Sequence, residues 1–163
     1  MRIDKFTTKF QEALSDAQSL ALGNDNAYIE PVHLLAAMLR QDDGPRALLE
    51  RAGANVPGLL AAADAAVKRL PQVTGQDQVQ GGPELGRVLQ ATEKEAIKRG
   101  DQFIASELFL LALIDSKGDA ARIAKENGLS RKSLETAIEA VRGGQKMDSA
   151  EGEGQREALK KYT

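Results

Sequence analysis

The 163-residue chain contains 42% hydrophobic residues, 28% charged residues and a formal net charge of −2, which is typical of a globular protein with room for one domain or two small ones. The slightly acidic balance argues against nucleic-acid binding, and the lack of cysteine excludes disulfides and thiolate sites. The longest apolar runs, such as residues 108–114, are too short to cross a bilayer, and residues 1–5 lack an apolar signal segment, so we expect a cytoplasmic location and no membrane partner.

Helix start and stop signals divide the first half of the chain into four helices. Thr8 and Gln11 have the spacing of a capping box, which predicts the start of the first helix, and Gly23 follows its last apolar position. Pro31 is typical of the first turn of a helix, and Gly53 is typical of a helix end. The four predicted helices cover about residues 8–23, 31–39, 45–52 and 56–70.

The second half shows the same succession after a connector. Residues 71–82 have no hydrophobic periodicity, which predicts a flexible connector. Glycines again mark the predicted helix ends, at Gly100, Gly128 and Gly143. The predicted helices cover about residues 83–99, 106–114, 120–127 and 130–142.

The two halves match one another at a constant offset of 75 residues, which pairs Leu14 with Leu89 and Ile29 with Ile104. Equivalent helix signals in register, without gaps, indicate an internal duplication. We therefore expect an all-α fold in which a duplicated four-helix unit, with about eight helices, forms one pseudo-two-fold domain. The expected domain covers residues 1–143, with repeats at about 1–70 and 83–143.

The last twenty residues differ from the rest of the chain. Residues 144–155 are polar and glycine-rich and lack an apolar stripe, which predicts a flexible linker. Residues 156–163 have the composition of the start of another element. This pattern indicates a fragment of a larger protein.

No sequence motif indicates catalysis. The chain has no phosphate-binding loop, no dinucleotide-binding glycine motif and no zinc-protease motif. The single histidine, His33, lies within an apolar predicted helix, so we interpret it as a buried structural residue. Glu151 and Glu153 are interpreted as solvated surface residues. We expect no catalytic residue, no metal site and no cofactor in this chain.

Two other features receive structural interpretations. Tyr28 and Phe103 occupy equivalent places in the two halves, just before helices, and are predicted to pack in the core at the helix entrances rather than to stack on a ligand. Residues 130–132, Ser-Arg-Lys, begin a predicted helix. Because the whole chain is acidic, they do not indicate a DNA-recognition helix.

Four segments carry a resemblance to a known family. They are YIEPVHLLAAML at 28–39, RGDQFIASELFLLALI at 99–114, LPQV at 70–73 and EALKKYT at 157–163. With these segments, the whole chain resembles the N-terminal Clp domain of ClpB-type AAA+ protein disaggregases. The last segment is similar to the beginning of the first AAA+ module in that family.

The resemblance implies a substrate-engaging domain without an activity of its own. Members of the family are ATP-dependent homohexamers with a coiled-coil middle domain that work with a DnaK-type chaperone system to solubilise and refold aggregated proteins. ATP and magnesium would bind beyond residue 163, so we expect this fragment to be a monomer and not an enzyme. Its expected partners are unfolded or aggregated client proteins, whose exposed apolar segments it binds in a surface groove and passes to the AAA+ pore.

The same resemblance implies five client-binding residues. Thr7, Asp101 and Glu107 match polar positions attributed to this role, and Leu89 and Leu108 match the apolar groove. Each position also has a structural alternative. Thr7 is placed to cap the first helix, Asp101 to fix a turn, and Glu107 to interact with the positive end of its helix. The two leucines are alternatively core residues.

Two other functions remain open on the sequence. One is the N-terminal domain of a degradative Clp ATPase, which docks adaptor proteins for a peptidase. The connector at 70–73 and the tail at 157–163 favour the disaggregase. The other is a small enzyme with an unrecognised site, which one histidine and no cysteine disfavour.

Overall fold

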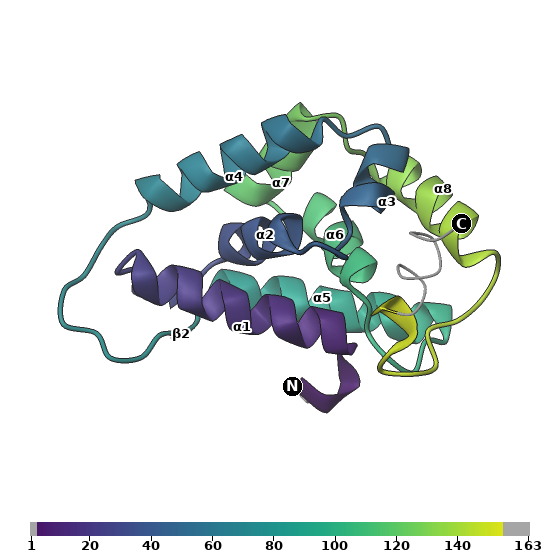
Figure 1. The fold of residues 1–163 in the computed structure, drawn as a ribbon, viewed down its shortest axis with the longest axis horizontal. Helices are drawn as coiled ribbons and strands as arrows, with labels where there is room; N and C mark the ends of the chain where they lie inside the picture. The colour runs from purple at the N-terminus through teal and green to yellow at the C-terminus, as the bar shows by residue number, and fades with distance from the viewer. Residues whose placement is uncertain (1–2, 155–163) are drawn as a thin grey trace.

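A computed structural model describes residues 3–154, and Figure 1 shows them as packed helices. One short pair of parallel strands accompanies the helices. Within this range there are eight α-helices, so the predicted all-α fold with about eight helices is confirmed. In chain order the elements are η1 (Ile3–Lys5), α1 (Thr8–Gly23), β1 (Tyr28–Ile29), α2 (Pro31–Arg40), α3 (Arg46–Arg51), α4 (Val56–Arg69), β2 (Gln80–Gly81), α5 (Pro83–Arg99), α6 (Ser106–Ile114), α7 (Asp119–Glu126) and α8 (Arg131–Arg142).

The internal duplication is visible in the positions of the helices. The starts of α1, α2 and α4 recur 75 residues later as the starts of α5, α6 and α8. The backbone pairing between the two repeats shows the same offset of 75 residues. Ile29 pairs in parallel with Gly81, and Phe6 pairs in parallel with Ile104. Adding or subtracting 75 converts one pair into the other, as a pseudo-two-fold axis requires.

Side-chain and glycine caps set several helix ends. Thr7 is the N-cap of α1, because its hydroxyl accepts a hydrogen bond from the Phe10 amide. The structural alternative for Thr7 is confirmed, and the capping box predicted at Thr8 begins one residue too late. Asn55 and Ser130 cap the equivalent helices α4 and α8 in the same way. Gly100 ends α5 with φ of 76°, a left-handed conformation that favours glycine.

The core is centred on the equivalent helices α2 and α6. Every residue of α6, from Ser106 to Ile114, is buried, and so is every residue of α2 up to Leu39. In Figure 1 both helices lie inside the molecule, with α1 and α5 on one side and α4 and α7 on the other. A helix that is apolar on all faces has to be enclosed by other elements.

The two segments expected to be flexible form contacts with the helices. In the connector, Gln80–Gly81 forms β2, and Val79 is 3% exposed. In the C-terminal segment, Met147 is 5% exposed and Glu153 is 2% exposed. Residue 155 and the expected start of a following module at 156–163 lie outside the described residues. No helix within residues 3–154 combines the length and apolar character needed to cross a membrane.

Candidate functional site

An apolar groove lies between α1 and α5. It has a volume of about 370 Å³ and is lined by Ile3, Phe6, Gln11, Leu14, Ser15, Gln18, Ile29 and Leu89. We call it the α1–α5 groove. Leu14 and Leu89, which are equivalent in the two repeats, both line it, and Ile3 at its border is 60% exposed. The groove therefore presents aliphatic side chains from both repeats to solvent.

The structure separates the two leucines expected in a groove. Leu89 is partly buried and lines the α1–α5 groove. Leu108 is 0% exposed and belongs to the core around α6. Leu108 is therefore a core residue, which was the structural alternative for this position, because all faces of α6 are covered.

Thr7 is buried as well, with 0% exposure. Its hydroxyl caps α1 and donates a hydrogen bond of 2.6 Å to Oε2 of Glu153. The same carboxylate oxygen accepts a hydrogen bond of 3.1 Å from the amide of Ser106, at the start of α6. Thr7 thus links the beginning of α1 to the beginning of α6 through a residue near the end of the described chain.

Asp101 and Glu107 share one cation, Arg142. The Arg142 guanidinium donates to Asp101 Oδ2 at 2.8 Å and to Glu107 Oε2 at 2.9 Å. The side chains of Arg142, Asp101 and Glu107 are only 5%, 0% and 2% exposed. Burial lowers the pKa of Arg142, but the adjacent Glu107 and Asp101 carboxylates raise it more, so the net shift is upward. Arg142 therefore stays charged and forms an ion pair with each of the two acids.

Glu153 brings a third acid next to this group, and its burial corrects the interpretation of this residue as solvated surface. Burial raises the pKa of Glu153, and the negative charge of Glu107 raises it further. Together Thr7, Asp101, Glu107, Arg142 and Glu153 form what we call the buried polar cluster. The structure thus unites the three predicted polar site residues, but inside the domain and beneath the C-terminal segment.

Sequence patterns did not reveal Arg142 or Glu153 as members of this cluster. Arg142 lies in the last turn of α8, where a basic residue is ordinary. Glu153 lies in a segment whose composition resembles a solvated linker.

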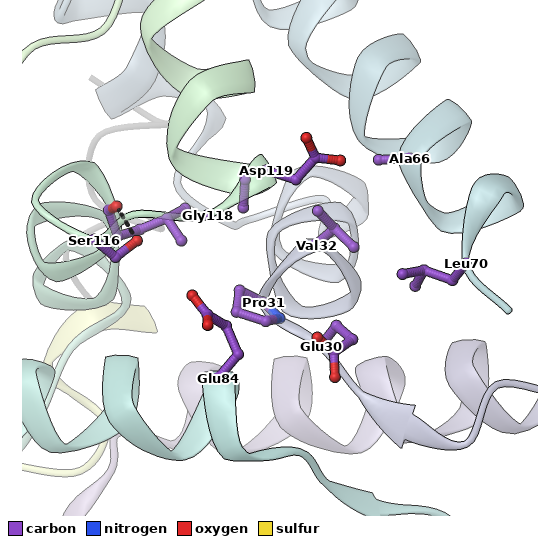
Figure 2. A pocket seen from close by; sticks show the side chains of 11 residues that line it. Glu30, Pro31, Val32, Ala66, Leu70, Glu84, Ser116, Gly118 and Asp119 are labelled. Atoms are coloured by element: carbon purple, nitrogen blue, oxygen red, sulfur yellow. Dashed lines mark hydrogen bonds between the residues drawn. The ribbon is translucent and has the colours of Figure 1, made fainter.

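A second cavity, of about 240 Å³, lies where α2, α4, α5 and α7 meet. Figure 2 shows Glu30, Glu84 and Asp119 around it. Glu84 pairs with Arg87 at 2.9 Å, and Asp119 pairs with Arg122 at 2.6 Å. Burial raises the pKa of Glu30, and the charge of Glu84 raises it further. None of the sequence-predicted site residues lines this cavity.

His33, which was predicted to be a structural residue, is buried among hydrogen-bond partners. His33 is 0% exposed, its Nδ1 accepts from the Glu30 amide, and its Nε2 lies 2.8 Å from Asn26 Oδ1. Its interpretation as a buried structural residue is confirmed, and burial lowers its pKa to about 4.

Tyr28 is 52% exposed, so its predicted packing in the core is wrong. Within residues 3–154, no group of three or more acidic or histidine side chains could hold a metal ion.

Residues 5–127 match the family described as the Clp repeat (R) N-terminal domain. The chain belongs to this family. The chaperone protein ClpB of Vibrio cholerae is 47% identical to it, and the aligned region covers 100% of the chain and 19% of that relative. ClpB of Pseudomonas putida is 42% identical with the same coverage. The chain thus spans about a fifth of the length of these relatives and matches their N-terminal region.

Solved structures agree with this assignment. The Hsp104 N-terminal domain from Candida albicans has a TM-score of 0.81 and 25% identity, over 91% of this chain and 99% of that one. A complex of the ClpV N-domain with a VipB peptide has a TM-score of 0.69 and 22% identity, over 84% of this chain and 86% of that one. The first similarity supports the resemblance to the N-terminal domain of a ClpB-type chaperone, which is non-catalytic, and the second shows the shared fold.

Proposed function

We propose that this domain binds exposed apolar segments of unfolded or aggregated client proteins in the α1–α5 groove and passes them to the pore of a ClpB-type disaggregase. The supporting observation is the groove itself, where Ile3, Leu14 and Leu89 from separate elements form one accessible aliphatic surface. Apolar groups gathered on a surface favour association with other apolar groups, since contact removes both from water.

Such binding is expected to be weak. Fully burying one leucine contributes about 1.5–3 kcal/mol, and the groove leucines are already partly covered. Association itself costs roughly 4–15 kcal/mol. A dissociation constant of about 10 μM to 1 mM follows for one domain. Six domains in one homohexamer would raise the avidity without new contacts.

We propose that the five residues predicted from the sequence have different roles in client binding. Leu89 contacts the client. Leu108 supports the groove from the core, and Thr7, Asp101 and Glu107 support it from the buried polar cluster. These four side chains have exposures too low for direct contact with a client in the described conformation.

The wider activity belongs to the parent protein. We propose that it is a cytoplasmic homohexamer that uses ATP and magnesium in AAA+ modules after residue 163 and works with a DnaK-type chaperone. The 163-residue chain itself is proposed to be a monomer without ATPase activity or a cofactor.

Docking of folded adaptor proteins, as in a degradative Clp ATPase, is the second candidate. The N-terminal domain of ClpD from Arabidopsis thaliana has the same fold, with a TM-score of 0.63 and 19% identity. Client capture and adaptor docking can be separated by two titrations of the domain. One uses a polypeptide that chemical modification keeps unfolded, and the other uses the unmodified, folded form of the same protein. We expect binding of the unfolded form alone. Binding of the folded form with equal or higher affinity would contradict client capture and favour adaptor docking.

A further inference from the structure

The chain after α8 returns to the body of the domain and docks there. In Figure 1 this yellow segment lies near the start of α1. The Met147 carbonyl accepts hydrogen bonds from the amides of Gln102 and Phe103, at 2.9 and 3.0 Å. The Ala150 carbonyl accepts one from the Thr8 amide at 2.9 Å. We call residues 145–154 the C-terminal clasp.

Glu153 is the most deeply buried polar contact of the clasp. One oxygen of its carboxylate, Oε2, accepts from the Thr7 hydroxyl at 2.6 Å and from the Ser106 amide at 3.1 Å. These donors lie at the beginnings of α1 and α6, where unpaired amides favour an acceptor. Glu153 thereby ties the clasp to one helix of each repeat.

The contacts of Glu153 continue to the α1–α5 groove. Thr7 follows Phe6, which lines the groove. The Thr7 amide donates to the Ile104 carbonyl, and the Ile104 amide donates to the Lys5 carbonyl. The strand-like segment that carries Phe6 is thus held on one side by Ile104 and at its end by Glu153. If the clasp leaves, Thr7 loses a buried acceptor and the wall formed by Phe6 loses a restraint.

We propose that Glu153 is a positioning residue that couples the C-terminal clasp to the α1–α5 groove. When the clasp is docked, the buried side chain of Phe6 is held in the position that supports the groove in its client-binding conformation. By linkage, a client in the groove stabilises the docked clasp by the same factor. Docking of the C-terminal clasp, which leads to residue 155, therefore depends on whether a client occupies the groove. The part of this inference that concerns clients rests on the proposed function, whereas docking of the clasp does not.

The charge of Glu153 is not required for this role. Its neighbours Asp101, Glu107 and Arg142 already carry one excess negative charge when both acids are ionised, since one cation faces two acids, so a charged Glu153 would add a further buried negative charge. What Thr7 and Ser106 need is an acceptor oxygen, which a glutamine also supplies. Glu153→Gln should keep the clasp docked, and Glu153→Ala should release it. Glu151→Ala is the matched control, because Glu151 belongs to the same clasp but accepts an exposed hydrogen bond, from the Thr8 hydroxyl at 2.6 Å.

Hydrogen exchange of the Gln102 and Phe103 amides, measured by NMR on the full 163-residue chain, reports docking of the clasp. We expect exchange at least about tenfold faster in Glu153→Ala and close to wild type in Glu153→Gln and Glu151→Ala, as loss of buried hydrogen bonds implies. Met147→Ser, which changes a buried apolar side chain of the clasp and no side chain of the polar cluster, should also accelerate exchange and serves if Glu153→Ala does not fold. Unchanged exchange in Glu153→Ala, or equal acceleration in Glu153→Gln, would overturn the role of Glu153 in docking. Unchanged exchange in Met147→Ser would contradict docking of the clasp itself.

Titration with a permanently unfolded polypeptide tests the coupling. We expect the client to slow exchange of the same amides in wild type and to bind at least about fivefold more weakly to Glu153→Ala. Faster exchange with unchanged client affinity would refute the coupling and leave client binding standing. Absence of client binding by wild type would refute the proposed function and the coupling together, while the exchange data would still establish whether Glu153 holds the clasp.

Discussion

Leu14 and Leu89 are equivalent residues of the two repeats and line the same groove. The duplication therefore places two copies of one apolar position on a shared surface near the pseudo-two-fold axis. Neither repeat alone would form this groove, because its walls come from α1 and α5. Duplication of a helical unit thus creates an apolar surface that neither copy has alone, and this surface is the proposed client-binding site.

Replacement of either groove leucine by serine should weaken client binding without unfolding the domain. In Leu14→Ser and Leu89→Ser the lost side chain is only partly buried, so the free energy of unfolding should fall by less than the roughly 2–5 kcal/mol typical of a buried leucine. Client affinity should fall at least about threefold, as partial loss of a leucine contact implies. Thermal melts and titrations with an unfolded polypeptide measure both quantities.

Two exposed apolar residues outside the groove provide controls on the same helices. Leu22 on α1 is 37% exposed, and Ile97 on α5 is 70% exposed. Leu22→Ser and Ile97→Ser should leave client affinity unchanged. If they weaken binding as much as the groove variants do, capture depends on general surface hydrophobicity and not on the groove.

Leu108 should behave as a core residue. Because its side chain is 0% exposed, Leu108→Ala should lower the free energy of unfolding by about 2–5 kcal/mol. Leu34→Ala, at a fully buried position of α2, should have a similar effect. Denaturant unfolding measures both. A loss below about 1 kcal/mol for Leu108→Ala would place this side chain at an open surface and return it to the client site.

Much of the fold could be predicted from the sequence because its helix ends carry local signals. Asn55, Ser130 and Gly100 act through hydrogen bonds or backbone conformations set within a few residues. For the first helix the sequence left both Thr7 and Thr8 as candidate caps, since the two side chains are chemically identical. Their roles differ only through the position of the Phe10 amide.

The candidate site was harder to predict. Residues 108–114 are apolar without interruption, so no amphipathic pattern distinguishes a groove side from a core side. The partners of Asp101 and Glu107 depend on Arg142, which is 35 residues or more away in sequence. The position of Glu153 depends on the path of the chain after α8, and a polar, glycine-rich composition does not determine such a path.

Removal of Arg142 should destabilise the domain strongly. Arg142→Met leaves Asp101 and Glu107 buried without their cation, which should lower the free energy of unfolding by about 3–5 kcal/mol. Addition of Glu107→Gln to this variant should restore part of the loss. The control is Arg40→Met, which breaks an exposed pair with Asp64 and should cost less than about 1 kcal/mol. Equal losses in denaturant unfolding would contradict a buried ion network.

His33 should make stability depend on pH. Its pKa falls from 6.5 to about 4 on folding because burial disfavours the charged ring. Between these values the unfolded chain binds a proton that the folded domain does not, so stability falls as pH is lowered. His33 should contribute a loss of about 3 kcal/mol between neutral pH and pH 4.

The histidine contribution can be isolated by difference. The upward pKa shifts of Glu30 and Glu153 act with the opposite sign, because the folded domain binds those protons more readily. They are common to wild type and His33→Gln. The gap in unfolding free energy between the two proteins should therefore change with pH between 6.5 and 4. A gap that stays constant across this range would refute the shift.

The equivalent glycines Gly53 and Gly128 should differ in their tolerance of alanine. Both have a left-handed backbone, with φ of 91° and 98°, so each substitution should cost about 1–2 kcal/mol. A Cβ at Gly53 would meet open space, whereas one at Gly128 would lie 2.8 Å from the Gly53 carbonyl oxygen. Gly128→Ala should therefore lower the melting temperature more than Gly53→Ala. Equal effects would show that the repeats separate easily at this contact.

The most direct test of client capture is to locate a bound client on the surface. An unfolded polypeptide carrying a nitroxide spin label should broaden the methyl NMR signals of Ile3, Leu14 and Leu89, which line the α1–α5 groove. The methyl signals of Leu70 and Leu113, in the cavity beside Glu30, should keep their intensity. Broadening confined to Leu70 and Leu113, or spread evenly over both sets, would contradict capture in the groove.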